Sequence, residues 1–386
     1  MRKLAPYLFP VIVVSLTVLG LIVLSSAGCA AAQRFGRMDP YHFIYRQLIY
    51  LGGALVVGLI VAALDYHLWQ RIPFLTILSY LVVMGLLVAV FFFPRINGSW
   101  RWINLGFFNL QPSELSKIFL IIALSVYLDR LEWRIDTIKY GFIGPCVVLG
   151  GFAGLILFET DFGSVMVLGI LTLALMVLFD VKWRYTGTIL GMGATLFLVK
   201  LINDGNRMNR IAAFLGVSLS GEDAALNPAA YQSNMALVAL QRGGLTGVGY
   251  MQSMQKYGYL PEAHTDFIFA VGTEEFGLIF SLGVILLFLL FFILALVIAR
   301  NASDRFGSNL AYGMALLIFF EAMFNIAVVC GAAPSKGMAL PFFSYGGTNI
   351  VVTYFAVGMI LSVAFHRAKE FAHRHKQRLS RVIMRG

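Results

Sequence analysis

The chain has 386 residues, of which 59% are hydrophobic and only 12% are charged. A soluble domain carries about a quarter charged residues, whereas several apolar runs here reach the roughly 18 residues that a helix needs to cross a bilayer. This composition excludes a soluble enzyme, a disulfide scaffold, a disordered chain and a β-barrel, and it predicts an all-α polytopic membrane protein.

The apolar runs predict ten transmembrane helices, with expected ranges 7–27, 47–64, 73–93, 114–128, 140–158, 162–179, 185–202, 267–299, 308–331 and 341–365. The run 267–299 is long for a single crossing, so we expect that helix to be tilted, extended beyond the bilayer, or broken near Gly272, Gly277 or Gly283. Residues 26–29 resemble a lipoprotein cleavage site, but loss of the first run would leave an odd number of crossings.

The basic residues predict the orientation of the chain. An even number of crossings places both termini on one side, and most basic loops fall on that same side, which the positive-inside rule makes cytoplasmic. The net charge is +10, and much of it lies in the tail 366–386. Beside a spanning helix, this basic tail is interpreted as a cytoplasmic segment lying on anionic lipid, not as a nucleic-acid-binding segment.

The segment 200–266 is much longer than the other loops, and we expect it to be a large extracytoplasmic loop between the seventh and eighth helices. Its apolar stretches favour short helices on the membrane surface. Its glycine-rich turn, residues 243–249, suits either phosphate binding or a sharp change of direction. Residues 1–386 are interpreted as a single transmembrane domain that includes this loop and the basic tail.

Charged side chains at or near bilayer depth are costly, so each is expected to have a partner or a task. In this chain the acidic ones gather on the expected extracytoplasmic half, where Asp266 ends the long loop and Asp161 lies in the tight turn before the sixth helix. With nearby cations they predict an outward-facing polar pocket for an anionic, lipid-anchored substrate. A carboxylate base with cations that neutralise phosphate suits an enzyme, but the same residues suit a transporter equally well.

Some of these residues also have a purely structural interpretation. Asp161 could cap the N-terminus of the sixth helix. Glu114 and Lys117, three residues apart, share one helix face and could form a structural ion pair.

Taken together, the motifs resemble the SEDS family (shape, elongation, division and sporulation), which contains FtsW, RodA and SpoVE. The resemblance covers nearly the whole chain, and its division branch is the more similar one. It rests on Asn97-Gly98-Ser99, Arg101-Trp102-Ile103, Pro112-Ser113-Glu114-Leu115 with Lys117, Asp161-Phe162-Gly163-Ser164, Tyr231-Gln232, the glycines of 243–249, and the runs 259–270 and 335–347.

The resemblance implies a peptidoglycan glycosyltransferase that polymerises lipid II at the outer face of the bacterial inner membrane, for septal wall synthesis. It implies Asp266 as the catalytic residue. We assign substrate binding to Arg101, Glu114, Lys117, Asp161, Gln232, His264, Lys336 and Ser344. A RodA-like elongation polymerase and a lipid II flippase are the alternatives.

The expected partners are lipid II, a class B penicillin-binding protein (a transpeptidase of the FtsI type) and other divisome membrane proteins. No cofactor and no metal ligands are assigned, and a role for a divalent cation at the pyrophosphate stays open. In the expected chemistry Asp266 accepts the proton of a sugar hydroxyl, while Arg101, Lys117 and Lys336 stabilise the departing pyrophosphate. The family commonly has Gln-Pro where this chain has Glu159-Thr160, which predicts an additional negative charge beside Asp161.

Overall fold

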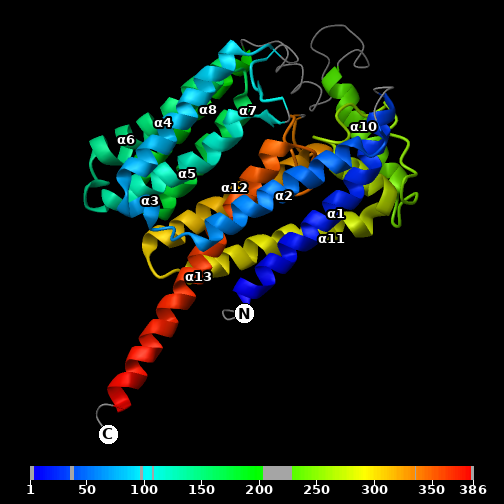
Figure 1. Cartoon of the computed structure of the whole chain (residues 1–386). Coiled ribbons are helices and arrows are strands. Elements are labelled where there is room, and N and C mark those ends of the chain that lie inside the picture. Colours follow the sequence, from blue (N-terminus) through cyan, green and yellow to red (C-terminus); the bar gives the residue numbers. More distant parts are fainter. Residues whose placement is uncertain are drawn as a thin grey trace.

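A computed structural model of the protein describes residues 4–34, 39–95, 99–106, 108–202, 228–334 and 336–383. It is a helical bundle with one short hairpin (Figure 1). In chain order the elements are α1 (Ala5–Arg34), α2 (His42–Ala63), α3 (Leu68–Arg71), α4 (Pro73–Ala89), η1 (Val90–Phe92), β1 (Ile103–Asn104), β2 (Asn109–Leu110), α5 (Pro112–Arg130), η2 (Glu132–Arg134), η3 (Lys139–Ile143), α6 (Gly144–Phe158), α7 (Phe162–Leu178), α8 (Trp183–Ile202), α10 (Pro228–Gly243), α11 (Ile268–Arg300), α12 (Arg305–Val329) and α13 (Gly347–Ile383).

The structure confirms an all-α membrane fold. Each predicted crossing overlaps one of these helices. Within the described residues, seven stretches are long and apolar enough to span a bilayer, and α7 is a shorter apolar helix. The number of ten crossings stays a prediction. The last predicted range starts too early, because residues 341–346 form turns and α13 begins only at Gly347.

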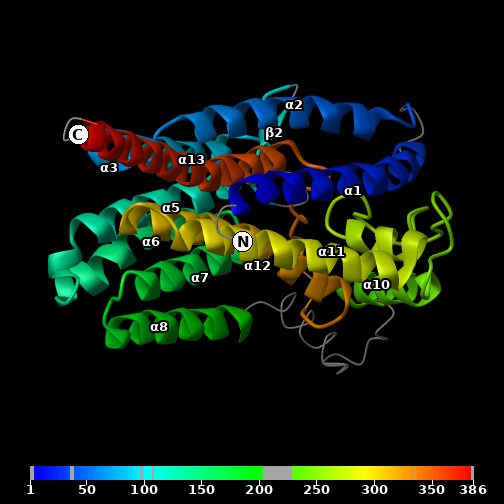
Figure 2. The ribbon, with the colours of Figure 1, turned by 90° about the horizontal axis from the view of Figure 1, so that it is seen from below.

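The helices pack so that segments far apart in sequence lie side by side. Helix α13 runs along α2, and α11 lies between α1 and α12, while α4, α5, α6, α7 and α8 form the other part of the bundle (Figure 2). Large aromatic side chains fill the interior, among them the fully buried Phe288, Phe291 and Phe343. Beyond the bundle, α13 continues as a long helix toward the C-terminus (Figure 1).

Helix α11 is broken at Gly277, one of the three glycines proposed for a break. Gly277 has φ 79° and ψ −173°, a conformation that is essentially restricted to glycine. The glycine-rich turn fits into this break, because Leu278 N–H donates to the Gly244 carbonyl at 2.9 Å and Val248 N–H donates to the Glu274 carbonyl at 3.0 Å. The turn therefore packs against α11, and its residues do not line the cavity described below.

A buried charged network fastens the segment after α10 to α1. Lys256 Nζ lies 2.8 Å from Glu275 Oε1 and donates to Ser26 Oγ at 2.7 Å. Ser26, within the stretch that resembles a cleavage site, is fully buried in α1. Helix α10 confirms a helix inside the long loop, whereas residues 203–227 of that loop, with the apolar stretch 211–219, lie outside the described residues.

Candidate active site

One cavity of about 570 Å³ collects most of the predicted site residues. Its wall combines the hairpin region, the first turns of α5 and α7, Gln232 of α10, the end of the loop before α11, the C-terminal half of α12 and the segment that leads into α13. All predicted site residues except His264 and Ser344 line it, namely Arg101, Glu114, Lys117, Asp161, Gln232, Asp266 and Lys336. Their roles in binding and catalysis stay predictions.

One side chain of α12 ties the backbone of Asp266 to the segment before α13. Asn325 Nδ2, on α12, donates to the Asp266 carbonyl at 2.7 Å and to the Met338 carbonyl at 2.6 Å. The Asp266 side chain lies directly on Gly337, where any Cβ would collide with its Oδ2 atom. The backbone of Asp266 is therefore held by α12, and its carboxyl group lies against the segment before α13.

His264 and Ser344 support the Asp266 segment from behind and do not face the cavity. Ser344 Oγ donates to the Thr265 carbonyl at 2.6 Å, and the Tyr345 N–H donates to the His264 carbonyl at 3.0 Å. The His264 ring packs on Phe43, with ring centroids 4.8 Å apart. Burial lowers the pKa of His264 below its usual range, opposed by the charge of Glu262, so at neutral pH this ring is an uncharged packing element.

The electrostatic setting of Asp266 suits a proton acceptor. Burial, followed by the charges of Glu262 and Asp161, raises its pKa to about 7, although Lys336 and Arg101 act in the opposite direction. A general base works best when its pKa lies near the operating pH. The sequence placed Asp266 at the end of the loop, but only the packing supplies this shift.

Asp161 is both a helix cap and a cavity residue. Its carboxylate accepts hydrogen bonds from Ser164 Oγ at 2.7 Å and from Ser164 N–H at 3.3 Å, at the N-terminus of α7. Burial acts to raise its pKa, but Arg101, Lys336 and the Ser164 bonds together hold that pKa below its ordinary value. Asp161 is therefore ionised and serves as a fixed counter-charge to the cavity cations.

Arg101 retains unused hydrogen-bonding capacity. One terminal nitrogen donates to the Thr160 carbonyl at 3.0 Å, while its buried Nε atom has no partner among the described residues. An unpaired buried donor is costly, and a guanidinium favours bidentate binding of phosphate oxygens. Arg101 is thus oriented by the α6–α7 turn and still able to bind an anion.

Lys336 is the second cation available in the cavity. Among the described residues, its ammonium has no hydrogen bond or close ion pair, and it lies 5.6 Å from the centre of the Phe324 ring. Its side chain lies against Gly163, where any Cβ would collide with Cε and Nζ. Burial lowers its pKa to about 8, with Asp161 acting to raise it, so the group is mostly charged at neutral pH.

Lys117 differs from these two cations because its charge is already balanced. Its Nζ atom lies 2.6 Å from Glu114 Oε1 and 2.5 Å from Glu321 Oε1, and its side chain is only 4% exposed. The predicted ion pair of Glu114 with Lys117 is therefore present. The prediction did not include Glu321 of α12, which is a second partner of Lys117. Lys117 fixes two carboxylates at the cavity wall.

Glu159 does not add the negative charge that the sequence predicted beside Asp161. Its side chain is fully buried, and neither carboxyl oxygen has a partner in the described part of the chain. Burial, then the neighbouring Asp161, raises its pKa to about 8, against the effect of Arg101. The group is therefore mostly protonated at pH 7. The prediction was wrong because the sequence shows that a glutamate is present but does not show that it is buried, and burial favours its protonated form.

Three further residues of this region were not assigned from the sequence. Glu262 lines the cavity and has a positive φ of 54°, Glu321 pairs with Lys117, and Asn325 supports Asp266. Glu321 and Asn325 are polar residues four apart in an apolar helix, which is a signal for a buried partner. That signal could not name the partner, because Lys117 lies about two hundred residues earlier in the chain.

The cavity carboxylates do not form a ready metal site. Within the described ranges, no three His, Cys, Asp or Glu side chains of the cavity come close enough together to share one ion. Chemically, the cavity combines one carboxyl group of near-neutral pKa with two cations that can still bind an anion. It can accept a proton at one point and stabilise negative charge at another.

Comparison of the sequence with known proteins shows to which family the chain belongs. The family model for FtsW, RodA and SpoVE, described as a cell cycle protein, matches residues 7–369. A probable peptidoglycan glycosyltransferase FtsW of Trichlorobacter lovleyi is 39% identical over 361 residues, covering 91% of each chain. That of Coxiella burnetii is 36% identical over 367 residues, covering 91% of this chain and 94% of the relative.

Solved structures share the fold. A chain of a peptidoglycan synthase complex, studied for the coordination of polymerization and crosslinking, matches with a TM-score of 0.73 at 23% identity, covering 94% of this chain and 98% of its own. The rod shape determining protein RodA of Thermus thermophilus matches with a TM-score of 0.66 at 22% identity, covering 93% of this chain and 96% of its own.

Fold and cavity define a multi-pass membrane protein with a charged site between its helices. The chain belongs to the FtsW/RodA/SpoVE family.

The balanced charge of Lys117 predicts a stability effect. Replacing Lys117 with Met leaves Glu114 and Glu321 buried without their cation, and breaking a buried pair in this way costs about 3–5 kcal/mol. We expect a clearly lower temperature of thermal unfolding in detergent. Lys336→Met is the matched control, because Lys336 has no close ion pair among the described residues, and it should unfold near the wild-type temperature. Equal unfolding temperatures for the two variants would contradict this assignment.

Proposed function

We propose that the protein is a peptidoglycan glycosyltransferase that polymerises lipid II, with Asp266 as the general base. The observation that carries this proposal is a single cavity in which Asp266, with a pKa of about 7, lies together with Arg101 and Lys336. The family membership and the relatives named peptidoglycan glycosyltransferase support the same activity.

The reaction needs one carboxylate and nearby cations. The 4-hydroxyl of the acceptor GlcNAc attacks the anomeric carbon of the donor MurNAc, and Asp266 takes the hydroxyl proton as the new glycosidic bond forms. The bond from the anomeric carbon to the pyrophosphate breaks, and undecaprenyl pyrophosphate leaves with its electron pair. This leaving group needs no proton but does need positive charge around its oxygens. The anomeric centre is inverted in such a direct displacement.

The cations of the cavity fit that task to different degrees. Among the described residues, one buried nitrogen of Arg101 has no partner and the Lys336 ammonium has no hydrogen bond or close ion pair, so both can bind phosphate oxygens. Lys117 is neutralised by Glu114 and Glu321 and would act mainly by holding the wall in shape. The cavity volume of about 570 Å³ lies in the range of small-molecule sites, which suits the reacting sugars and the pyrophosphate.

The relatives support an assignment of the biological setting. Those in the 33–39% identity range are named FtsW, whereas the RodA structure shares only the fold at 22% identity. We therefore assign the protein to septal wall synthesis in the bacterial inner membrane, with both termini in the cytoplasm. A class B penicillin-binding protein is the expected crosslinking partner, and other divisome membrane proteins are expected to assemble with it. The fold shared with a synthase complex chain supports such an assembly.

Substitution of Asp266 tests the general base directly. Asp266→Asn keeps the size of the side chain but removes its basicity, and general-base catalysis contributes typically 10²- to 10⁴-fold. We expect lipid II polymerisation by the purified protein to fall at least about 100-fold, with normal thermal unfolding. Asp136→Asn, at an exposed ion pair with Lys182, is the matched control and should polymerise normally.

The rival activity is tested in the same preparation. Reconstituted vesicles report glycan product and lipid II translocation separately. Translocation without glycan product would replace the polymerase proposal with a flippase. Wild-type rates of polymerisation by Asp266→Asn would remove the general-base assignment while leaving the activity itself in place.

The pH dependence of kcat/KM follows from two groups of the free enzyme. Asp266 must be ionised, so activity should fall as the pH drops through about 7, and Lys336 must be protonated, so activity should fall as the pH rises through about 8. Glu262→Gln removes a charge that raises the pKa of Asp266 and should move the acidic limb to lower pH. Lys336→Arg should extend activity to higher pH, because a guanidinium stays charged. A profile with neither displacement would contradict both roles.

The contact between Lys336 and Gly163 gives a test that keeps the lysine itself but displaces its ammonium group. Gly163→Ala introduces a Cβ into the space of the Lys336 ammonium and should lower kcat for polymerisation without loss of folded protein. Gly169→Ala, on the same helix α7 with open space around it, is the matched control. Equal activities of the two variants would show that the position of Lys336 does not matter for the reaction.

A further inference from the structure

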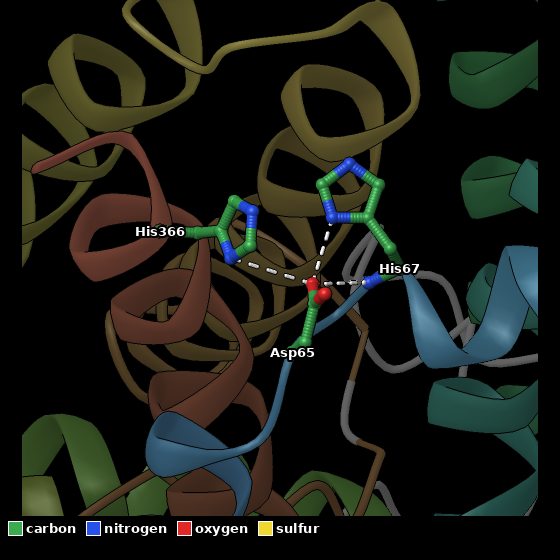
Figure 3. A group of neighbouring side chains, drawn as sticks. All are labelled: Asp65, His67 and His366. Carbon is green, nitrogen blue, oxygen red and sulfur yellow. Dashed lines mark hydrogen bonds and ion pairs between the residues drawn. The ribbon is translucent and has the colours of Figure 1, made fainter. Parts of the chain in front are cut away.

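A second polar cluster lies at the other end of the bundle from the cavity. It consists of Asp65, His67 and His366 (Figure 3). Asp65 Oδ1 lies 2.7 Å from His67 Nδ1 and 3.5 Å from His366 Nδ1. The ligand atoms of all three side chains lie within 4.8 Å of one another. Figure 3 shows the carboxylate pointing between the two imidazole rings.

The chain brings these residues together from distant segments. Asp65 and His67 lie in the connection from α2 to α3, and His366 lies on α13. Helix α13 continues beyond the bundle toward the C-terminus (Figure 1). Ser362 Oγ donates to the Leu64 carbonyl at 2.5 Å, which fixes this part of α13 against the end of α2. His366 is separated from the start of α13 by about 28 Å of helix, so the cluster is remote from the catalytic cavity.

Other side chains hold the ligands in orientation. His67 Nε2 lies 3.4 Å from Asp304 Oδ1. Asp304 in turn accepts a hydrogen bond from the Tyr66 hydroxyl and caps α12 through the Gly307 N–H at 3.0 Å. Metal-binding histidines usually have a carboxylate beside their second ring nitrogen, and donation of that N–H fixes the ring and its tautomer. Asp304 lies at this place beside His67.

We propose that Asp65, His67 and His366 form a binding site for a divalent transition-metal ion of the zinc class. Two imidazoles and one carboxylate are a ligand set that Zn²⁺ uses when a fourth position is left for water. Bond lengths of about 2.0–2.1 Å place tetrahedral ligand atoms roughly 3.3 Å apart, so distances of 2.7 and 3.5 Å need only small movements.

The charge of the cluster and its access to water also favour a divalent metal ion. Asp65 and Asp304 carry two negative charges, while Arg71, 3.2 Å from Asp65 Oδ2, carries one positive charge. The cluster with neutral imidazoles is thus net negative, and Arg71 occupies the carboxylate oxygen that the metal does not need. The side chains of Asp65, His67 and His366 are 25%, 14% and 24% exposed, which leaves a path from water to the fourth position.

The site would join two connections of the bundle to α13. A metal held by these ligands crosslinks the α2–α3 connection to α13, and through Asp304 it braces the connection from α11 to α12. It would stabilise the fold and fix the direction in which α13 leaves the bundle. Because the cavity is remote, the metal would take no part in the sugar chemistry, and this inference does not rest on the proposed function.

Metal binding to the full-length protein tests the proposal. The protein is purified in detergent without a histidine tag, treated with chelator and titrated with Zn²⁺ alone. We expect one tightly bound equivalent and a higher unfolding temperature. With Co²⁺ in place of Zn²⁺, we expect the intense visible absorption of a four-coordinate site.

Matched variants locate the site. His366→Gln and His67→Gln each remove one ligand and should abolish the tight equivalent. Asp304→Asn keeps a good helix cap but weakens the support of His67, so we expect 10- to 100-fold weaker Zn²⁺ binding. The control is a double variant of the tail, His373→Gln with His375→Gln, which should bind Zn²⁺ as the wild type does.

Three outcomes would overturn the proposal: no tight equivalent in the wild type, loss of that equivalent in the tail variant, or undiminished binding in His366→Gln. The Co²⁺ spectrum of the wild type needs no substitution, so the proposal stays testable even if a ligand variant fails to fold. Absence of a four-coordinate spectrum would also reject the site.

Discussion

A charge inside this bundle is costly unless an opposite charge is fixed against it, and this cost organises the cavity. Lys117 shows the balanced case, because two carboxylates from α5 and α12 contact one ammonium. Lys256 with Glu275 shows the same arrangement where the long loop meets α1 and α11. Both networks join helices that are far apart in sequence, so removing one partner leaves a charge that the apolar interior cannot solvate.

The candidate active site is the place where this balance is left incomplete. Arg101 keeps an unpaired buried nitrogen, and Lys336 lies near Asp161 without a close ion pair among the described residues. Asp266 is destabilised as an anion by burial and by its acidic neighbours. Two sugar-bearing substrates would complete the set, because the pyrophosphate of the donor would bind the cations while the hydroxyl of the acceptor would give its proton to Asp266. The incompletely paired charges of the cavity therefore act on the reacting groups of the substrate.

Supporting residues give the cavity its geometry. His264 and Ser344 were predicted to bind substrate, but the structure places them behind the Asp266 segment, where they hold its backbone. Gly163 and Gly337 contribute by lacking side chains, since Lys336 and Asp266 occupy the space that a Cβ would need. At the other end of the bundle, Asp304 has a comparable supporting position beside His67.

The sequence by itself determined the membrane class, the location of the helices and most of the charged residues that line the cavity. Long apolar runs have few alternatives in lipid, and charged residues such as Asp266 and Lys336 stand out against them. Even the break in α11 could be limited to three glycines. What only the tertiary structure decided was which charges meet. The partner of Lys117 comes from α12, Glu159 loses its charge through burial, and His366 reaches Asp65 from the last helix. Pairing and desolvation depend on distances across the bundle, and spacing along the chain carries no information about those distances.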